Sequence, residues 1–594
     1  MTARLWLDRA PDSGHRARWT GAQAVVWAAL TAALLLPTPR VAAAQTSLVP
    51  VQHPVYEWLH RQRILGNTPT YRLEMRPLSR GQVRAHLVRI DSLGSADPTA
   101  LADFDRSHLE TYLREFSPVG GDPGARATVL PAGDAVSGGE SLGDRARAWV
   151  RDYREPHLYA FADSSRSFVL DAWGSWGRTS GSETDGTFAT FRDEKGLRAY
   201  ADFLGHLGMH LEAGNLAGHG SDAAVRYDPL YNKTFEAVVQ GKSNSTYVEA
   251  SASARWGPLA FSIGHGGMQV GPGRRTSLML SRDASTFDWL RLDADFGKFR
   301  YTAVHGSLAS DVEFGQIVFP DDTVRTNYAG ARWLAIHRFD VQPIEQLRIG
   351  FTEMLTYSAR PTDYAYLNPV APLFFSELDS GDRDNAVWVF DATVRPVDRV
   401  ELYGALFIDD LVTFGDIFNS GPEVDVDRAF DLGVDAALPY GLEAGLRYVR
   451  IEPWVYTHWQ RLNTLDQRGF PLGHPLGPNA TSREAHVRAW LPLRGYVGLS
   501  VAQSKKGLNP LDADGNVRVN VGGDLEMGAL TSEQGNYGLF ESSDLQEFRT
   551  LGFEAGFEPI RGVRVGVEYG RRTQTAGTRM PDFDFLGVRL RYGM

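Results

Sequence analysis

Leu586-Gly587-Val588-Arg589-Leu590-Arg591-Tyr592-Gly593-Met594 alternates large apolar residues with glycine and arginine. Successive side chains of a strand point to opposite faces, so this stretch predicts a strand with one apolar face. The same alternation occurs in residues 563–570 and 430–436. A soluble sandwich of this size would contain strands that are apolar on both faces. Here the second face is charged or glycine-rich, which favours a barrel with lipid outside and a wet lumen inside.

The connections between the predicted strands point the same way. The strands run from 167–178 to 582–594 and number about 18, the even count of bacterial outer-membrane barrels. Tight turns, such as Gly297-Lys298, Pro439-Tyr440 and Pro492-Leu493, alternate with the long loops 359–383, 453–481 and 507–546. Short periplasmic turns and long external loops are typical of these barrels. We therefore expect an all-β transmembrane outer-membrane β-barrel of antiparallel strands, closed because no strand edge can face lipid unpaired.

The first 44 residues have the pattern of a cleaved secretory signal. Arg16 and Arg18 precede an apolar stretch from Ala24 to Leu36, and Ala42-Ala43-Ala44 follows. The apolar stretch is too short to span a bilayer, which takes about 20 residues. We expect export, with cleavage after Ala44.

In residues 50–118 the apolar residues recur every three or four positions, which is the spacing of one face of a helix. Ser79-Arg80-Gly81-Gln82 predicts a capping box at a helix start, and Asp97-Pro98 predicts a second start. Residues 119–148 are rich in Gly, Ala, Pro and Asp, as linkers are. The predicted organisation is a signal peptide (1–44), a small α-helical module that braces or plugs the barrel on the periplasmic side (45–118), a linker (119–166) and the barrel (167–594).

Composition and motifs exclude several classes of function. The formal charge of −11 argues against nucleic-acid binding, and the lack of cysteine excludes thiol nucleophiles and cysteine zinc sites. We find no nucleophile elbow, metal-binding histidine pair or phosphate-binding glycine loop. Asp512-Ala513-Asp514-Gly515-Asn516 resembles half a calcium loop but lacks the glutamate, so a plain turn is favoured. We expect no metal, no cofactor and no enzymatic activity.

Several short motifs stand out along the predicted strands and loops. They are His337-Arg338, Glu353 with Tyr357, Tyr366-Leu367-Asn368-Pro369, Asp384-Asn385, Asp409-Asp410 and the N-terminal run 76–83. Their order and spacing resemble the Wzi capsule assembly family of outer-membrane proteins from about residue 50 to the end. The resemblance implies an 18-stranded barrel with a periplasmic helical bundle. It also implies a lectin that holds capsular or other surface polysaccharide, neither an enzyme nor an open pore.

The external loops supply candidate sugar-binding residues. Sugars are bound by aromatic faces with amide or carboxylate groups beside them. We expect the following residues to gather near one external rim of the barrel and to contact sugar: Tyr364, Tyr366, Asn368, Asp384, Asn385, Asp409 and Asp410. The alternative is that the Tyr366 motif is a turn and that the acids pair with barrel arginines. Asp409 and Asp410 point to opposite faces of a strand, so they do not form a catalytic dyad.

Loop 453–481 supplies two further candidates. Trp459 offers an aromatic face, and Arg461 suits an acidic sugar. Trp454 and Tyr456 are better explained as part of the interfacial aromatic girdle.

Two functions remain open. The first is a non-enzymatic, lectin-like protein that anchors surface polysaccharide. Its expected partners are this polysaccharide and outer-membrane lipid, with the polysaccharide export machinery as a further candidate. We expect it to be a monomer. The second is a porin whose helical module tethers it to the cell wall, since residues 53–90 also loosely resemble an S-layer-homology module.

Overall fold

The computed structural model describes most of the chain after residue 44. The described residues are 45–117, 157–163, 165–183, 186–220, 235–239, 242–309, 315–318, 324–327, 331–381, 383–409, 427–529 and 537–593. The expected signal peptide, most of the expected linker, Asp410 and Met594 lie outside these ranges.

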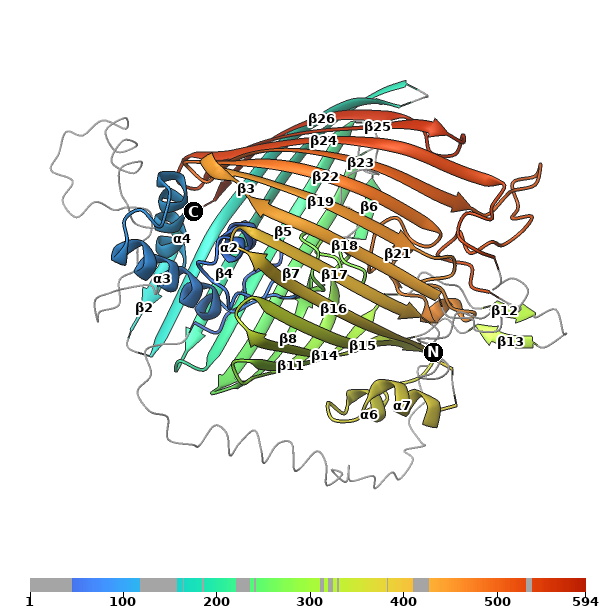
Figure 1. The fold of residues 1–594 in the computed structure, drawn as a ribbon, viewed down its shortest axis with the longest axis horizontal. Coiled ribbons are helices and arrows are strands. Elements are labelled where there is room, and N and C mark those ends of the chain that lie inside the picture. The colour runs from blue at the N-terminus through green and yellow to red at the C-terminus, as the bar shows by residue number, and fades with distance from the viewer. Residues whose placement is uncertain are drawn as a thin grey trace, which may run out of the picture. The chain divides into compact units, whose positions relative to one another are not determined.

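Eighteen antiparallel strands close into a barrel (Figure 1). The last strand pairs along its whole length with residues 173–183 of the first, for example Leu590 with Trp176, which closes the wall. Every strand predicted from the alternation is present. The wall consists of β3 (Arg166–Glu183), β4 (Gly186–Phe203), β5 (Leu207–Gly220), β7 (Lys242–Trp256), β8 (Leu259–Gly266), β10 (Phe287–Asp295), β11 (Phe299–Leu308), β14 (Arg332–Ile344), β15 (Leu347–Ser358), β16 (Asn385–Val397), β17 (Val400–Asp409), β18 (Asp427–Ala437), β19 (Leu442–Ile451), β22 (Ala480–Leu491), β23 (Gly495–Leu508), β24 (Asp544–Ile560), β25 (Val563–Ala576) and β26 (Phe583–Gly593).

Short strands and helices complete the described structure. The strands are β1 (Met75–Arg76), β2 (Tyr159–Ala162), β6 (Phe235–Val239), β9 (Gln269–Val270), β12 (Gly315–Val318), β13 (Val324–Asn327), β20 (Asp466–Gln467) and β21 (Phe470–Pro471). The helices are α2 (Val55–Ile64), α3 (Arg80–Ala96), α4 (Asp103–Glu115), α6 (Tyr364–Leu367), α7 (Leu373–Asp379) and the 3₁₀ turns Pro439–Gly441 and Arg461–Asn463. No helix within the described ranges is both long and apolar enough to span a membrane.

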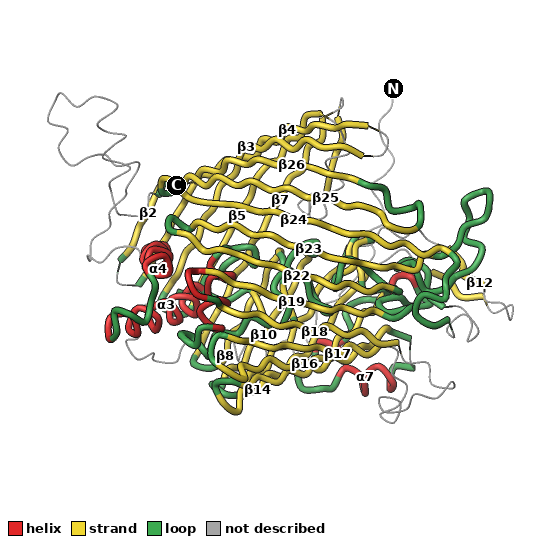
Figure 2. The backbone as a smooth tube through the Cα atoms, turned by 45° about the horizontal axis from the view of Figure 1, so that its top comes forward, coloured by secondary structure: helices red, strands yellow, loops and turns green. Residues whose placement is uncertain are grey.

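The barrel has a short-turn end and a long-loop end, as predicted. Gly297, Tyr440 and Leu493 have positive φ angles at turns of the short-turn end, which reverse the chain in three or four residues. Helices α2–α4 lie at this same end (Figure 1), and Figure 2 shows α3 and α4 there from a second direction. The ring of His108 donates a hydrogen bond to the carbonyl of Leu491 at 2.8 Å, which joins α4 to the turn after β22.

One helix start was predicted correctly and the other was not. Ser79 and Gln82 form the predicted capping box at the start of α3. Asp97 does not begin a helix: it ends α3, and its carboxylate accepts the N–H of Thr99 at 2.8 Å. Helix α4 starts later, at Asp103. The aspartate of a helix start and that of a turn make the same side-chain to backbone bond, so the local pattern does not distinguish them.

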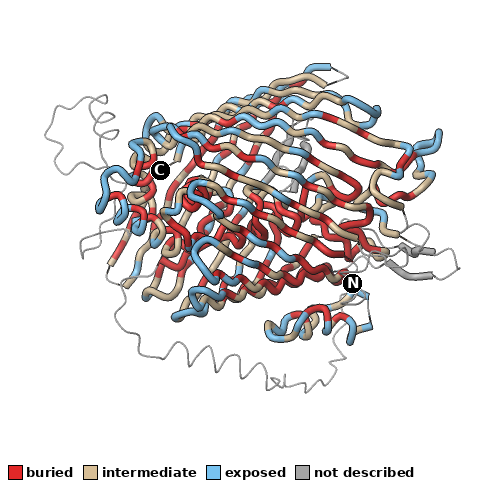
Figure 3. Tube along the Cα trace, viewed as in Figure 1, coloured by how far each residue is buried: buried red, intermediate tan, exposed pale blue. Residues whose placement is uncertain are grey.

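Inserted chain fills part of the lumen, which corrects the expectation of a wet interior throughout. Residues 45–78 enter from the short-turn end, and residues 267–286 and 452–479 enter from the long-loop end. Strand β1 of the first segment pairs with β9 of the second. Inward side chains of β10–β19, such as Leu334, Ile336 and Phe407, pack with Met75 and Val270 in one apolar cluster. In Figure 3 buried residues accordingly concentrate in the lower half of the barrel.

The opposite part of the lumen stays polar. Cavities of about 310 and 550 Å³ lie against β22–β26 and are lined by charged side chains that include Arg275, Arg488 and Glu554. The expected charged inner face is therefore present on this side of the barrel.

Candidate functional site

The loop between β15 and β16 folds back along the outside of the barrel. Its helices α6 and α7 lie outside the wall (Figure 1). Asp363 caps α6 by accepting the N–H of Ala365 at 3.0 Å. Glu353, an outward residue of β15, accepts the N–H of Leu373 at the start of α7 at 3.2 Å. We call residues 359–384 the external hairpin.

A buried polar cluster fixes the external hairpin to the wall. The Tyr366 hydroxyl donates to Asp384 Oδ2 at 2.7 Å. Arg360 donates to the other oxygen of Asp384 at 2.9 Å and lies over the ring of Tyr357, 4.7 Å from its centre. The Tyr357 hydroxyl accepts the N–H of Asp363 at 2.9 Å. The alternative interpretation is met only in part: Asp384 pairs with an arginine, but Arg360 belongs to the hairpin and not to the barrel, and Tyr366 lies in helix α6 and not in a turn.

The predicted site residues lie on two sides of the wall. Tyr364 and Asn368 are exposed on the outside, and Asn368 accepts the N–H of Val370 at 3.1 Å in a turn. Asn385 points inward and donates to the carbonyls of Thr457 and Asn463, each at 3.2 Å. The single rim cluster that we expected is therefore divided by the barrel wall.

Inside the barrel, Asp409 fixes the loop after β19. Its Oδ2 accepts the N–H of Tyr456 at 2.7 Å. Tyr456 is fully buried, with its ring 5.2 Å from that of Phe407, and its hydroxyl donates to the carbonyl of Leu278 at 3.0 Å. Trp454 is buried as well. The assignment of Trp454 and Tyr456 to the interfacial girdle is wrong, because this loop turns into the lumen instead of lying at the membrane surface.

Trp459 and Arg461 remain at the surface of the same loop. Both are half-buried, and the Trp459 ring lies 5.1 Å from that of His458. Arg461 forms an ion pair with Glu526 at 2.6 Å, which brings loops 453–481 and 507–546 together. The hydrogen bond from Arg461 holds the pKa of Glu526 below its ordinary value. This surface combines an aromatic face with a charged pair whose outer edge reaches solvent.

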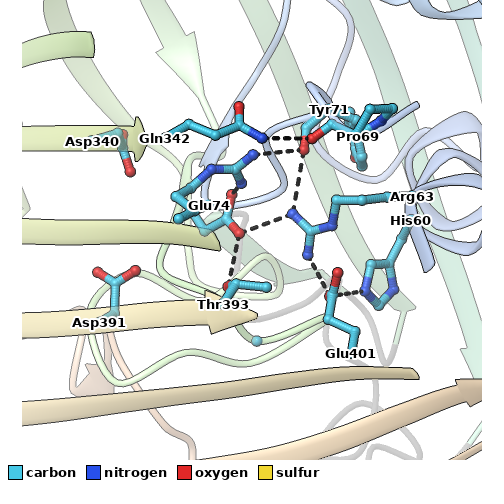
Figure 4. A network of polar contacts seen from close by, with 12 residues as sticks. His60, Arg63, Pro69, Tyr71, Glu74, Asp340, Gln342, Asp391, Thr393 and Glu401 are labelled. Atoms are coloured by element: carbon cyan, nitrogen blue, oxygen red, sulfur yellow. Dashed lines mark hydrogen bonds and ion pairs between the residues drawn. The ribbon is translucent and has the colours of Figure 1, made fainter. Parts of the chain in front are cut away.

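Charged residues missed by the sequence analysis join the first inserted segment, residues 45–78, to the barrel wall. Arg63 on α2 lies between Glu74 at 2.9 Å and Glu401 of the wall at 2.6 Å, and His60 contacts the same Glu401 at 3.0 Å (Figure 4). Burial alone would raise the pKa of Glu74, but Arg348 and Arg63 overcome it and hold this pKa far below its usual range. These partners are too far apart in sequence for spacing to reveal them.

Two features of the chain bear on metal binding. Within the described residues, no cluster of three or more His, Asp or Glu side chains is arranged to hold a metal ion. Asp512 accepts the N–H groups of Asp514 and Asn516, both at 2.9 Å, which is the predicted plain turn.

Comparison with protein families gives a match to the capsule assembly protein Wzi over residues 190–541, more than half of the chain. The chain belongs to the Wzi capsule assembly family. It is accordingly an outer-membrane protein of capsule assembly. A search of curated proteins found no significant match.

One solved structure shares the fold. Wzi of Escherichia coli, described as a carbohydrate-binding β-barrel of group 1 capsule assembly, is 11% identical with a TM-score of 0.53. The match covers 92% of this chain and 99% of that one, and at this identity it shows the shared barrel alone. OccAB2 of Acinetobacter baumannii (9% identity, TM-score 0.40, 72% and 98% covered) and OccD3 of Pseudomonas aeruginosa (10%, 0.40, 72% and 91%) are looser matches that carry no structural argument.

Proposed function

We propose that this Wzi family member is a non-enzymatic lectin that holds exported polysaccharide at the cell surface. The family match over residues 190–541 carries the proposal. The structure supports it because the inserted segments occupy part of the lumen. The buried acids Asp384 and Asp409 also accept hydrogen bonds from neighbouring parts of the same chain. A structural acid of this kind is poorly placed to act as a general acid or base.

The surface around Trp459 is our choice for the sugar contact. An aromatic face binds the apolar side of a pyranose, and the Arg461–Glu526 pair offers donors and acceptors for its hydroxyls. Because Glu526 already neutralises Arg461, this surface suits the hydroxyls of a neutral sugar better than the carboxylate of an acidic one. Tyr366, Asp384, Asn385 and Asp409 would then act indirectly, by fixing the loops.

The orientation follows from the loops. We place the short-turn end and α2–α4 in the periplasm and the long-loop end outside, with the signal peptide removed after Ala44. The protein would act as a monomer in outer-membrane lipid, beside the export machinery, and would bind no nucleic acid.

Binding of purified polysaccharide tests the proposal. The detergent-solubilised protein should retain surface polysaccharide from its own source strain and should not retain dextran of equal length. The polysaccharide should also come off at its original length, since no bond is cleaved. Equal retention of both polymers would refute a lectin, and shortening of the chain would refute the non-enzymatic assignment.

A further inference from the structure

The external hairpin is packed on one side and apolar on the other. Leu373 and Phe374 of α7 face the wall, where Phe374 packs with Trp388 and Ile408. Tyr366 and Leu373 pack with Tyr357 and Leu355 in a second cluster. The hairpin therefore covers outward side chains of β14–β17 that would otherwise face lipid.

The opposite face of the hairpin carries large apolar side chains. Val370 is 86% exposed, Phe375 55% and Leu378 42%, and the ring of Tyr364 is 80% exposed. Phe375 and Leu378 are three residues apart on α7, so they lie on one side of the helix. Exposed apolar groups that cluster in this way indicate a contact surface.

This face continues the lipid-facing surface of the barrel. Ile349, Phe390 and Leu402 are outward residues of β15, β16 and β17 below the hairpin, and all three are exposed. The hairpin thus extends an apolar surface whose occupant is the bilayer.

The backbone of the hairpin is suited to that environment. Asp363, Asn368 and Glu353 accept N–H groups at the ends of α6 and α7, which reduces the number of polar groups exposed to an apolar medium. Charged Asp379 and Arg383 are exposed at the end of the hairpin, which favours a position at the boundary over the bilayer centre.

We propose that the external hairpin is a lipid-interface anchor, with Val370, Phe375 and Leu378 inserted among outer-leaflet lipids at the boundary of acyl chains and headgroups. The anchor would fix the height of this rim in the membrane. The inference rests on the outer-membrane location and not on polysaccharide binding, so either can fail without the other.

The absence of cysteine allows a direct test by single spin labels. Val370→Cys and Leu378→Cys would be labelled with a nitroxide and reconstituted in palmitoyl-oleoyl-phosphatidylcholine vesicles. Collision with oxygen, which concentrates in lipid, is then compared with collision with a water-soluble nickel chelate. Val588→Cys on the lipid face of β26 and Asp514→Cys at an exposed turn are the lipid and water controls.

At both hairpin positions the nitroxide should collide more often with oxygen than with the nickel chelate. The ratio should correspond to a depth of about 5–10 Å below the headgroups. Preference for the nickel chelate, as at position 514, would show that the hairpin lies in water and would overturn the proposal. Shielding from both reagents would overturn it as well, because the face would then be covered by a second copy of the chain. Heat-modifiable mobility on gels confirms that each labelled barrel is folded.

Discussion

Arg274 donates a hydrogen bond to the Glu57 carboxylate at 3.0 Å, although 217 residues separate them in the chain. Glu57 lies on α2, which approaches from the short-turn end, and Arg274 lies in the connection from β8 to β10 at the long-loop end. The same carboxylate accepts a hydrogen bond from Arg282 at 2.9 Å. The two inserted segments are therefore joined within the barrel by a largely buried ion pair, whose side chains are 12% and 13% exposed.

Replacing Glu57 should destabilise the barrel. Glu57→Gln removes the charge that Arg274 and Arg282 share, while Arg274 keeps its ion pair with Glu443, so the change should cost about 1.5–3 kcal/mol in free energy of unfolding. Urea unfolding in lipid vesicles, followed by tryptophan fluorescence, measures this loss. The matched control is Glu110→Gln: its carboxylate is exposed and pairs with Arg114 at 3.9 Å, so the change should stay below about 0.5 kcal/mol.

The same carboxylate predicts a pH dependence. Burial alone would raise the pKa of Glu57, but Arg274, Arg282 and Arg488 hold it well below its ordinary value of 4.5. A carboxylate with a lowered pKa in the folded state adds stability above the unfolded pKa and loses it as the pH falls. The difference in free energy of unfolding between the wild type and Glu57→Gln should therefore become smaller below about pH 4.5. A difference that becomes larger as the pH falls would contradict a lowered pKa for Glu57.

The inserted segments also predict weak ion conduction. Large, stable openings need a continuous wide lumen, and here one half of the barrel is filled by apolar packing around Met75 and Val270. Single-channel recording in planar bilayers should show no openings of porin size. Their presence in the wild type would favour the porin alternative.

The strands were predictable from the sequence because alternation is a local property. Leu586, Val588 and Leu590 face outward and Arg589 and Arg591 inward, as their spacing required. The filling of the lumen was not predictable, since it depends on contacts such as Glu57 with Arg274 between distant segments.

The candidate site was predicted only in part, for a related reason. Asp384 and Asn385 are neighbours in sequence, yet one holds Tyr366 outside the wall and the other holds Asn463 inside it. Trp454 and Trp459 belong to one loop, but only Trp459 reaches the surface. The path of a loop decides such differences, and residue type does not encode that path.

Asp384 should control how firmly the external hairpin is held. Asp384→Asn weakens charged hydrogen bonds from Arg360, each typically contributing about 1.5–3 kcal/mol. Limited trypsin digestion at Arg360 and Arg383 should become faster by about tenfold, because local opening becomes more frequent. Asp379→Asn, at an exposed position of the same hairpin, should leave the rate unchanged; equal acceleration in both variants would show that the cluster does not hold the hairpin.

Trp459→Ala should weaken polysaccharide binding by about tenfold, since an aromatic contact contributes about 1 kcal/mol beyond its buried area. Equilibrium binding of labelled polysaccharide measures the effect. Tyr440→Ala is the matched control, because it removes a fully exposed aromatic ring at the short-turn end. Unchanged affinity of the Trp459 variant would remove this surface from the proposed site.

The most direct test of the account is the partition of surface polysaccharide between cells and medium, with and without this gene. If the protein holds polysaccharide at the surface, deletion should release polymer into the medium while total synthesis stays constant. An unchanged partition together with reduced uptake of small solutes would contradict the account and indicate a porin.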